Sequence, residues 1–183
     1  MTHLRRVFAT FTGFALLFSA VMGVSGATSD DAVVEITALP DAGLSASITG
    51  VAFADVPYSF ENTTRTGSFV ITALDNRGTA AGWNIILSAD DFKNEDESRS
   101  FGAGQLSLAA GTIVTNAGNS DTSGLQTFAS ANASADGAKI VNAAVGSGDG
   151  QYTVTSVGTL VVPGGTLVDT YSSLVTVSIT SGP

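Results

Sequence analysis

The chain contains no cysteine and only one histidine, His3, among its 183 residues. Without cysteine there is no disulfide framework, so packing and sheet hydrogen bonds must stabilise the fold. Beyond position 3 the chain also lacks the residues that a Ser-His or Cys-His nucleophile pair and an ordinary zinc site require. We therefore expect a protein that is not an enzyme, with no catalytic residue, no metal and no cofactor.

Carboxylates leave two alternative kinds of site open. Paired acids such as Asp90 and Asp149 would suit glycoside hydrolysis if the fold placed them on both sides of a sugar. The acidic run over residues 90–97 would supply oxygen ligands to calcium, although it lacks the spacing of an EF-hand loop. We expect these acids to form a solvated surface instead.

Basic side chains are scarce, and the chain carries a formal net charge of −9. After loss of a leader that ends at residue 27, it keeps five basic and sixteen acidic side chains, a net charge of −11. Nucleic acids and anionic lipid surfaces bind proteins through basic patches. The composition therefore predicts no nucleic-acid partner, no membrane partner after removal of the leader, and an acidic, self-repelling protein outside the cell.

The N-terminus has the pattern of a secretory signal peptide. Two arginines precede an almost wholly apolar run over residues 7–24, and small residues at 25–27 form a cleavage site. The run is also close to the roughly 18 residues that suggest a membrane span, so a retained anchor is the alternative. We favour cleavage after Ala27, because acidic residues follow at once, and we expect a single domain over residues 28–183.

The rest of the chain alternates short segments of apolar and polar residues with Gly-rich turns, and it shows no strong amphipathic helix and no fixed-period repeat. Such segments predict half-buried strands. The predicted strands span residues 32–39, 43–49, 67–74, 83–89, 105–109, 112–115, 125–131, 138–145, 151–157, 159–163 and 170–180. For residues 125–131 and 138–145 a short helical turn is the alternative, because both segments contain alanines. Many short strands at regular spacing predict an all-β fold, an antiparallel β-sandwich of the Ig-like or Greek-key type or a barrel-like variant of it.

The only tryptophan, Trp83, begins one of these strands. Residues 75–78 before it have turn chemistry, because Asx side chains and glycine accept the backbone angles of a turn. The sequence therefore predicts a hairpin between residues 67–74 and 83–89. Trp83 has two alternative roles in that hairpin, as a core residue or as a contact on a binding face.

The stretch over residues 75–85 reads DNRGTAAGWNI, and it resembles the first signature of the WxL domain family. The second signature of that family is a tyrosine followed by an alternating Thr-Trp-Thr-Leu strand, and residues 171–179 read YSSLVTVSI. Val177 stands at the position of the second tryptophan, and Ile85 and Ile179 replace the two leucines. The resemblance spans most of the chain after the leader.

The family consists of secreted bacterial surface proteins that attach non-covalently to peptidoglycan. The resemblance therefore implies a WxL-like domain that is secreted, associated with the cell wall and bound to peptidoglycan or another wall glycan. It also implies another surface protein as a further partner. The implied ligand-binding residues lie in the two signatures and the adjoining turn: Trp83, Asn84, Ile85, Arg77, Tyr171, Val177 and Ile179.

Two other functions stay open beside wall attachment. A structural matrix or filament subunit would assemble through exposed β-strand edges. A secreted hydrolase would turn over polysaccharide, and the lack of histidine beyond position 3 disfavours it. Retention on purified walls, polymers in negative stain and polysaccharide turnover distinguish the three functions.

Overall fold

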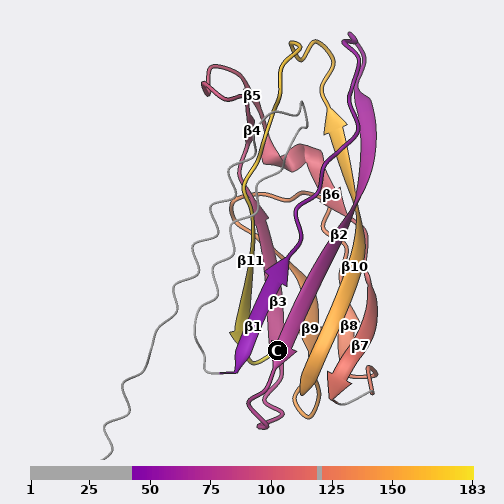
Figure 1. Ribbon diagram of the computed structural model, residues 1–183, viewed down its shortest axis with the longest axis vertical. Helices are drawn as coiled ribbons and strands as arrows, with labels where there is room; N and C mark the ends of the chain where they lie inside the picture. The colour runs from indigo at the N-terminus through magenta and orange to yellow at the C-terminus, as the bar shows by residue number, and fades with distance from the viewer. Residues whose placement is uncertain (1–42, 119–120) are drawn as a thin grey trace, which may run out of the picture.

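The computed structural model describes residues 43–118 and 121–183 of the protein (Figure 1). Its elements in chain order are β1 (Leu44–Ile48), β2 (Thr63–Asp75), β3 (Trp83–Ala89), β4 (Phe92–Lys93), β5 (Ser100–Phe101), η1 (Ala103–Gln105), β6 (Leu106–Leu108), β7 (Thr112–Gly118), β8 (Leu125–Thr127), β9 (Ala138–Ala143), β10 (Gly150–Val162) and β11 (Val175–Ser181). These elements confirm the all-β prediction. The expected signal peptide and its cleavage site, residues 1–27, and the predicted strand over residues 32–39 lie outside the described residues.

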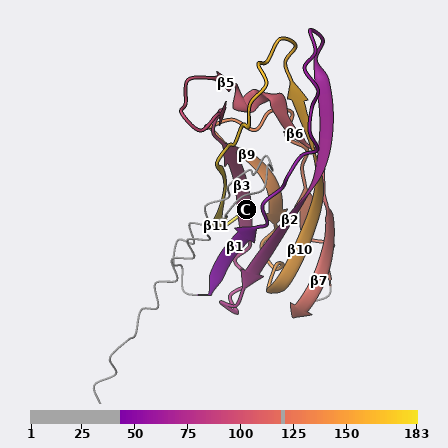
Figure 2. The same cartoon turned by 45° about the horizontal axis from the view of Figure 1, so that its top comes forward.

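The strands form two antiparallel sheets that face each other as a β-sandwich (Figures 1 and 2). The first sheet has the order β1-β2-β10-β6, and β7 also pairs with β10. The second sheet has the order β11-β3-β9-β8, and a short ribbon of β4 and β5 stands apart from both. β1 of the first sheet lies beside β11 of the second, so the sheets approach each other along that side. In the described ranges no helix is long and apolar enough to cross a membrane.

The two longest strands, β2 and β10, pair with each other over thirteen residues. Most of their buried positions are apolar, with Ile71 opposite Val154 in the ladder. Burial of a large apolar side chain contributes about 1.5–3 kcal/mol, so this pair of strands is a main source of stability. The sequence predicted two strands where β10 is one, with a break at Gly158. The strand continues through Gly158, where the ring of Phe69 packs on the space that a Cβ would fill.

The predicted hairpin between residues 67–74 and 83–89 is wrong. Both strands exist, but β2 belongs to the first sheet and β3 to the second. β2 is paired on both sides, by β1 and β10, and β3 is paired on both sides, by β11 and β9. Neither strand therefore has a free edge for the other. The connection over residues 76–82 crosses between the sheets, with positive φ angles at Gly78, Ala80 and Gly82.

The second sheet contains the stretch around Trp83. β3 covers residues 83–89 as predicted, and its side chains alternate between buried and half-buried along the whole strand. β11 begins at Val175, five residues later than predicted, and pairs with β3 at the edge of the sheet. β8 and β9 complete the sheet, and a register shift in the β3–β9 ladder lies between Ile85 and Ile86.

Candidate functional site

The structure brings the two signature stretches together on the adjacent strands β3 and β11. Ile85 lies directly opposite Ile179 in the ladder. Trp83 lies two positions from this pair on β3, and Val177 lies two positions from it on β11. Residues two apart on a strand face the same side of a sheet, so all four side chains share one face.

That shared face is the core of the sandwich. The relative exposure is 0% for Trp83 and Ile85, 1% for Val177 and 9% for Ile179. The alternation of β3 and β11 directs these four side chains between the two sheets. Their expected part in ligand binding stays a prediction.

Of the two roles expected for Trp83, the structure shows the core residue, and small residues lie beside its ring. Its indole nitrogen donates a hydrogen bond to the carbonyl oxygen of Gly148 at 3.0 Å. Ala143 lies opposite it in the ladder, and a Cβ at Gly148 would come within 2.5 Å of the indole nitrogen. The ring of Tyr152 from the first sheet lies 6.2 Å away between centroids. The neighbours thus leave room for the largest side chain and satisfy its only polar group.

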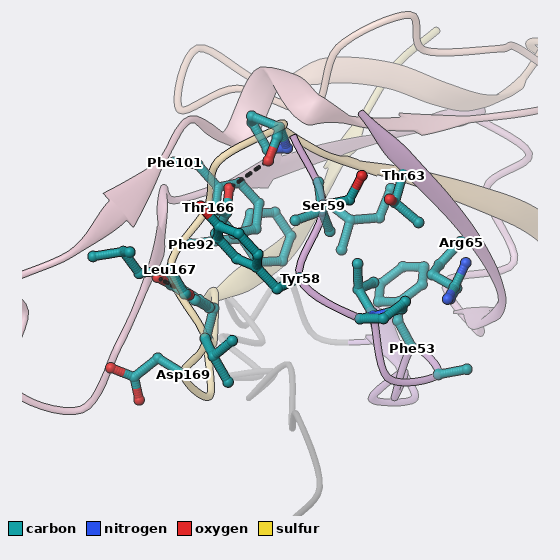
Figure 3. A pocket seen from close by; sticks show the side chains of 18 of the residues that line it. Phe53, Tyr58, Ser59, Thr63, Arg65, Phe92, Phe101, Thr166, Leu167 and Asp169 are labelled. Carbon is teal, nitrogen blue, oxygen red and sulfur yellow. Dashed lines mark hydrogen bonds between the residues drawn. The ribbon is translucent and has the colours of Figure 1, made fainter. Parts of the chain in front are cut away.

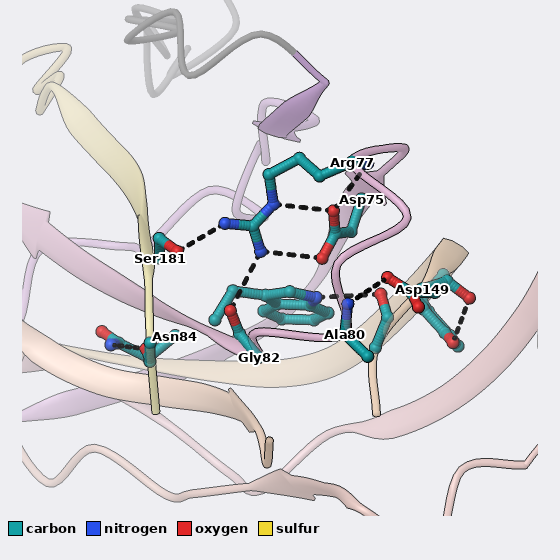
Figure 4. Close-up of polar contacts among 11 residues, drawn as sticks. Asp75, Arg77, Ala80, Gly82, Asn84, Asp149 and Ser181 are labelled. Carbon is teal, nitrogen blue, oxygen red and sulfur yellow. Dashed lines mark hydrogen bonds and ion pairs between the residues drawn. The ribbon is translucent and has the colours of Figure 1, made fainter. Parts of the chain in front are cut away.

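Arg77 ties the same end of the sandwich together (Figure 4). Its Nε and Nη2 atoms donate hydrogen bonds to the two carboxylate oxygens of Asp75, each at 2.8 Å. Nη2 also donates to the carbonyl of Gly82 at 3.0 Å, and Nη1 donates to the hydroxyl of Ser181. The guanidinium therefore links the end of β2, the crossing connection and the end of β11.

The ion pair of Asp75 and Arg77 is almost completely buried, with side-chain exposures of 0% and 9%. Burial alone raises the pKa of a carboxyl group, but the hydrogen bonds and the positive charge of Arg77 outweigh it, so the pKa of Asp75 is lowered. Both groups are therefore charged at neutral pH. With so little of its side chain exposed, Arg77 serves as a clamp within the fold.

Asn84 is the signature residue of β3 that faces outward. Its neighbours Trp83 and Ile85 point into the core, so the alternation of the strand directs Asn84 to the outer surface, where it is half-buried. Its side-chain nitrogen donates a hydrogen bond to the carbonyl oxygen of Gly182 at 2.9 Å (Figure 4). This bond holds the amide beside the end of β11.

Tyr171 lies at the opposite end of the sandwich from Trp83. It precedes β11, and because β11 runs antiparallel to β3, it lies beyond the end of β3 that Trp83 does not occupy. Its ring packs on Phe101, with centroids 5.3 Å apart, and its hydroxyl donates a hydrogen bond to the carbonyl of Leu167 at 2.9 Å. The structure therefore does not bring Tyr171 together with the other expected site residues.

Tyr171 contributes instead to a pocket of about 100 Å³, the loop-end pocket, which the sequence did not predict (Figure 3). Five aromatic residues line it: Phe53, Tyr58, Phe92, Phe101 and Tyr171. Phe92 and Phe101 stack on each other across the β4–β5 ribbon, with centroids 4.9 Å apart. Four large apolar residues of the surrounding loops are exposed: Tyr58, Phe60, Leu167 and Val168. Exposed apolar groups that gather in this way are typical of an interaction surface.

The two acids considered for hydrolysis lie at opposite ends of β3. Asp90 follows the last residue of the strand, whereas Asp149 accepts a hydrogen bond from the backbone of Ala80, before the strand begins. Seven strand residues at about 3.3 Å each separate these ends by roughly 20 Å. Glycoside hydrolysis needs a separation of about 5–9.5 Å, so this pair is excluded as a catalytic pair.

Two carboxylates of the acidic run over residues 90–97 already have partners within the run or beside it. Lys93 pairs with Glu97 at 2.8 Å, and Asp96 accepts hydrogen bonds from the backbone and hydroxyl of Ser98. Across residues 43–118 and 121–183, no three histidine, aspartate or glutamate side chains gather as metal ligands. The calcium alternative thus gains no support from the described geometry.

A family model described as "WxL domain surface cell wall-binding" matches residues 49–183. The chain belongs to the WxL family. No curated protein and no solved structure matches it. The matched range of this WxL domain contains every described strand except β1, so the family covers the sandwich almost completely.

The WxL domain also contains contacts that its signatures did not reveal. Gly148, which accepts the hydrogen bond from the indole of Trp83, lies in a Gly-rich segment outside both signatures. Ser181 and Gly182, beyond the second signature, hold Arg77 and Asn84. For the loop-end pocket, the available signal was a cluster of aromatic residues over 53–60, a segment whose proline interrupts any strand pattern.

Proposed function

We propose that this WxL domain is the wall-attachment unit of a secreted, non-enzymatic surface protein, and that its ligand is peptidoglycan. The family match over residues 49–183 carries the proposal, because the family is one of surface cell wall-binding domains. The leader pattern before residue 28 supports export. Membership of a binding family, together with the wide separation of Asp90 and Asp149, supports the absence of hydrolysis.

The buried signature residues would serve attachment by fixing the register of β3 against β11. A slip of one residue would turn every inward side chain of a strand to the outside. Trp83 fits one place in the core, beside Ala143 and below Gly148, so it opposes such a slip. On this proposal the signature decides which residues reach the outer surface, and those residues meet the wall.

Retention on purified peptidoglycan tests the proposal. Sacculi freed of protein and of secondary polymers should retain the folded protein after washing, and no soluble sugar should be released during incubation. A folded protein that stays in the supernatant would overturn wall attachment. Release of soluble sugar would instead identify a hydrolase.

An exposed edge strand favours a filament subunit as the second candidate. Among the described strands β7 pairs with β10 alone, and most of its residues are exposed, including Val114 at 58%. Such an edge is a template for β-addition from another chain. Polymers in negative stain that disappear with Val114→Lys would support this function, because a lysine on an edge opposes strand addition.

A further inference from the structure

The outer face of the second sheet carries an aligned set of polar side chains. Asn84 of β3 lies opposite Asn142 of β9, and Asn142 lies opposite Gln126 of β8. On its other side Asn84 lies opposite Thr180 of β11. Directly opposed residues of antiparallel strands project to the same face, so these four residues form one row across all four strands. We refer to Thr180, Asn84, Asn142 and Gln126 as the amide row.

The amide row offers evenly spaced hydrogen-bonding groups on a rigid support. Strands lie about 4.8 Å apart, so the row extends over about 14 Å. Each side-chain amide has an acceptor oxygen and two donor hydrogens. Asn84 donates to Gly182, and Asn142 accepts a hydrogen bond from Lys139 at 3.4 Å. Both amides are therefore oriented by the protein and still have capacity for a ligand.

A second row beside the first adds an apolar and a cationic group. Ser178 of β11 lies opposite Ile86 of β3, and Ile86 lies opposite Lys139 of β9. Ile86 is half-buried and Lys139 is exposed. A ligand that lies across the four strands would meet amides, an aliphatic side chain and an ammonium group within two neighbouring rows.

The charge of this face differs from that of the chain. Strands β3, β8, β9 and β11 contain no aspartate or glutamate, and Lys139 is their only charged residue. The chain as a whole carries a net charge of −9. The acids of the described residues lie in loops and at the end of β2 instead. The strands of this sheet therefore place no negative charge against a ligand that carries scattered carboxylates.

We infer that the amide row binds the N-acetylated glycan backbone of the cell wall, with carboxylates on that polymer pairing with Lys139. Sugar hydroxyl and acetamido groups both donate and accept hydrogen bonds, as the amides of the row do. The C–H surface of a sugar ring suits contact with Ile86. This inference rests on the proposed wall attachment and assigns its contact surface. It also gives the signature a role, because buried Trp83 and Ile85 direct Asn84 into the row.

The test compares two double variants for retention on sacculi freed of secondary polymers. Asn142→Ala/Gln126→Ala removes two amides of the row, and Thr66→Ala/Thr155→Ala removes two exposed hydroxyls from the outer face of the first sheet as a matched control. Melting temperatures of both should stay near the parent's, because the four side chains are exposed or half-exposed. We expect about a tenfold loss of affinity for the first variant, the effect of two ordinary hydrogen bonds, and none for the control.

Three probes identify which part of the wall polymer is bound: intact sacculi, sacculi whose stem peptides are removed by an amidase, and chitin, a polymer of N-acetylglucosamine. All three should be bound through the amide row. Amidase digestion frees the lactyl carboxylate of the glycan, and chitin has no such group. Lys139→Ala should therefore weaken retention on amidase-treated sacculi more than retention on chitin, where only the hydrogen bond from Lys139 to Asn142 is lost. Binding that vanishes with the stem peptides would overturn the glycan assignment.

Each remaining outcome separates this inference from the proposed function. If the parent protein binds sacculi and Asn142→Ala/Gln126→Ala binds them equally well, the amide row is excluded while wall attachment stands. If Tyr58→Ala/Phe60→Ala loses binding instead, the contact surface is the loop-end pocket and the inference is wrong. If the folded parent binds no sacculi at all, the proposed function fails, and the inference fails with it.

Discussion

The two ends of the sandwich differ in how far their large side chains are buried. At the signature end, the end of β3 that holds Trp83, the indole and the Asp75–Arg77 pair find their hydrogen-bonding partners within the chain. At the loop end, Phe60 and Val168 are exposed by 83% and 77% beside an aromatic pocket. The polar groups of the signature residues Trp83 and Arg77 are therefore paired within the chain, whereas the loop end presents a group of apolar side chains to solvent.

The difference shows that the residues of a short sequence motif can be required for folding without contacting a ligand. Few positions in a fold accommodate a tryptophan or a buried ion pair. In this domain Trp83 and the Asp75–Arg77 pair are buried, and Trp83 needs small neighbours. Of the seven residues expected to bind ligand, Asn84 is the one on β3 and β11 that faces outward.

Deletion of residues 171–183 should have the largest effect. It removes β11 and with it the buried side chains Val175, Val177 and Ile179, and it leaves β3 with an unpaired edge. We expect no cooperative unfolding transition by circular dichroism, whereas deletion of Pro183 alone should leave the transition in place. A truncated protein that melts like the parent would show that the sandwich folds stably without β11.

Trp83→Ala should destabilise the domain by about 3–5 kcal/mol, the usual cost of a large-to-small change in a core. Trp83→Phe should cost less, since it keeps an aromatic ring and loses the hydrogen bond to Gly148. Val145→Ala is the matched control at an exposed position. Urea denaturation gives the free energies of unfolding.

Wall retention of the same Trp83→Ala sample sharpens the comparison. Retention should fall only as far as the folded fraction falls, because the side chain is buried. A folded variant with much weaker retention would mean that Trp83 contacts the wall, in a conformation that exposes the ring.

The Asp75–Arg77 pair should make part of the stability depend on pH. The pKa of Asp75 is lowered in the folded state, so its contribution is present above the unfolded value near 3.9 and is lost as the pH falls through the folded pKa. Asp75→Asn should cost about 3–5 kcal/mol at pH 7, since it leaves a buried guanidinium unpaired. The cost should shrink toward pH 2, which urea denaturation at several pH values measures.

A double variant separates the charge from the space that the pair fills. Asp75→Asn/Arg77→Met removes both charges and should recover much of the stability lost in Asp75→Asn, because no unpaired charge stays buried. Equal losses in the single and the double variant would mean that the hydrogen bonds of Arg77 to Gly82 and Ser181 matter more than the ion pair.

Local pattern predicted the strands of this domain better than it predicted their partners. β3 was placed at its observed bounds because WNIILSA is rich in β-branched and aromatic residues. The turn chemistry of residues 75–78 correctly indicated that the chain turns after β2. It carried no information on which sheet the chain enters, since pairing depends on β1, β9, β10 and β11, which are distant in the sequence.

The candidate site was predictable to the same limited extent. That Asn84 faces away from Trp83 and Ile85 follows from the two-residue period of a strand. That Asn142 and Gln126 extend its row follows only from the ladders of β9 with β3 and β8. The register shift beside Ile85 changes which residue of β9 lies opposite Ile86, and no local signal in the sequence indicates it.

Tyr58→Ser/Phe60→Ser at the loop end should have the smallest effect on stability, about 0.5 kcal/mol, because the two residues are exposed by 49% and 83%. The two rings contact each other edge to face, with centroids 5.4 Å apart, at the margin of the loop-end pocket. The variant should bind less of a hydrophobic dye such as ANS, and its retention on sacculi should equal the parent's if the amide row carries wall binding. Phe53→Ser, in a half-buried ring that packs against Phe69, is the contrasting change and should destabilise clearly more. If Tyr58 and Phe60 instead prove as important to stability as Phe53, their side chains are buried in solution, and the contrast between the two ends is lost.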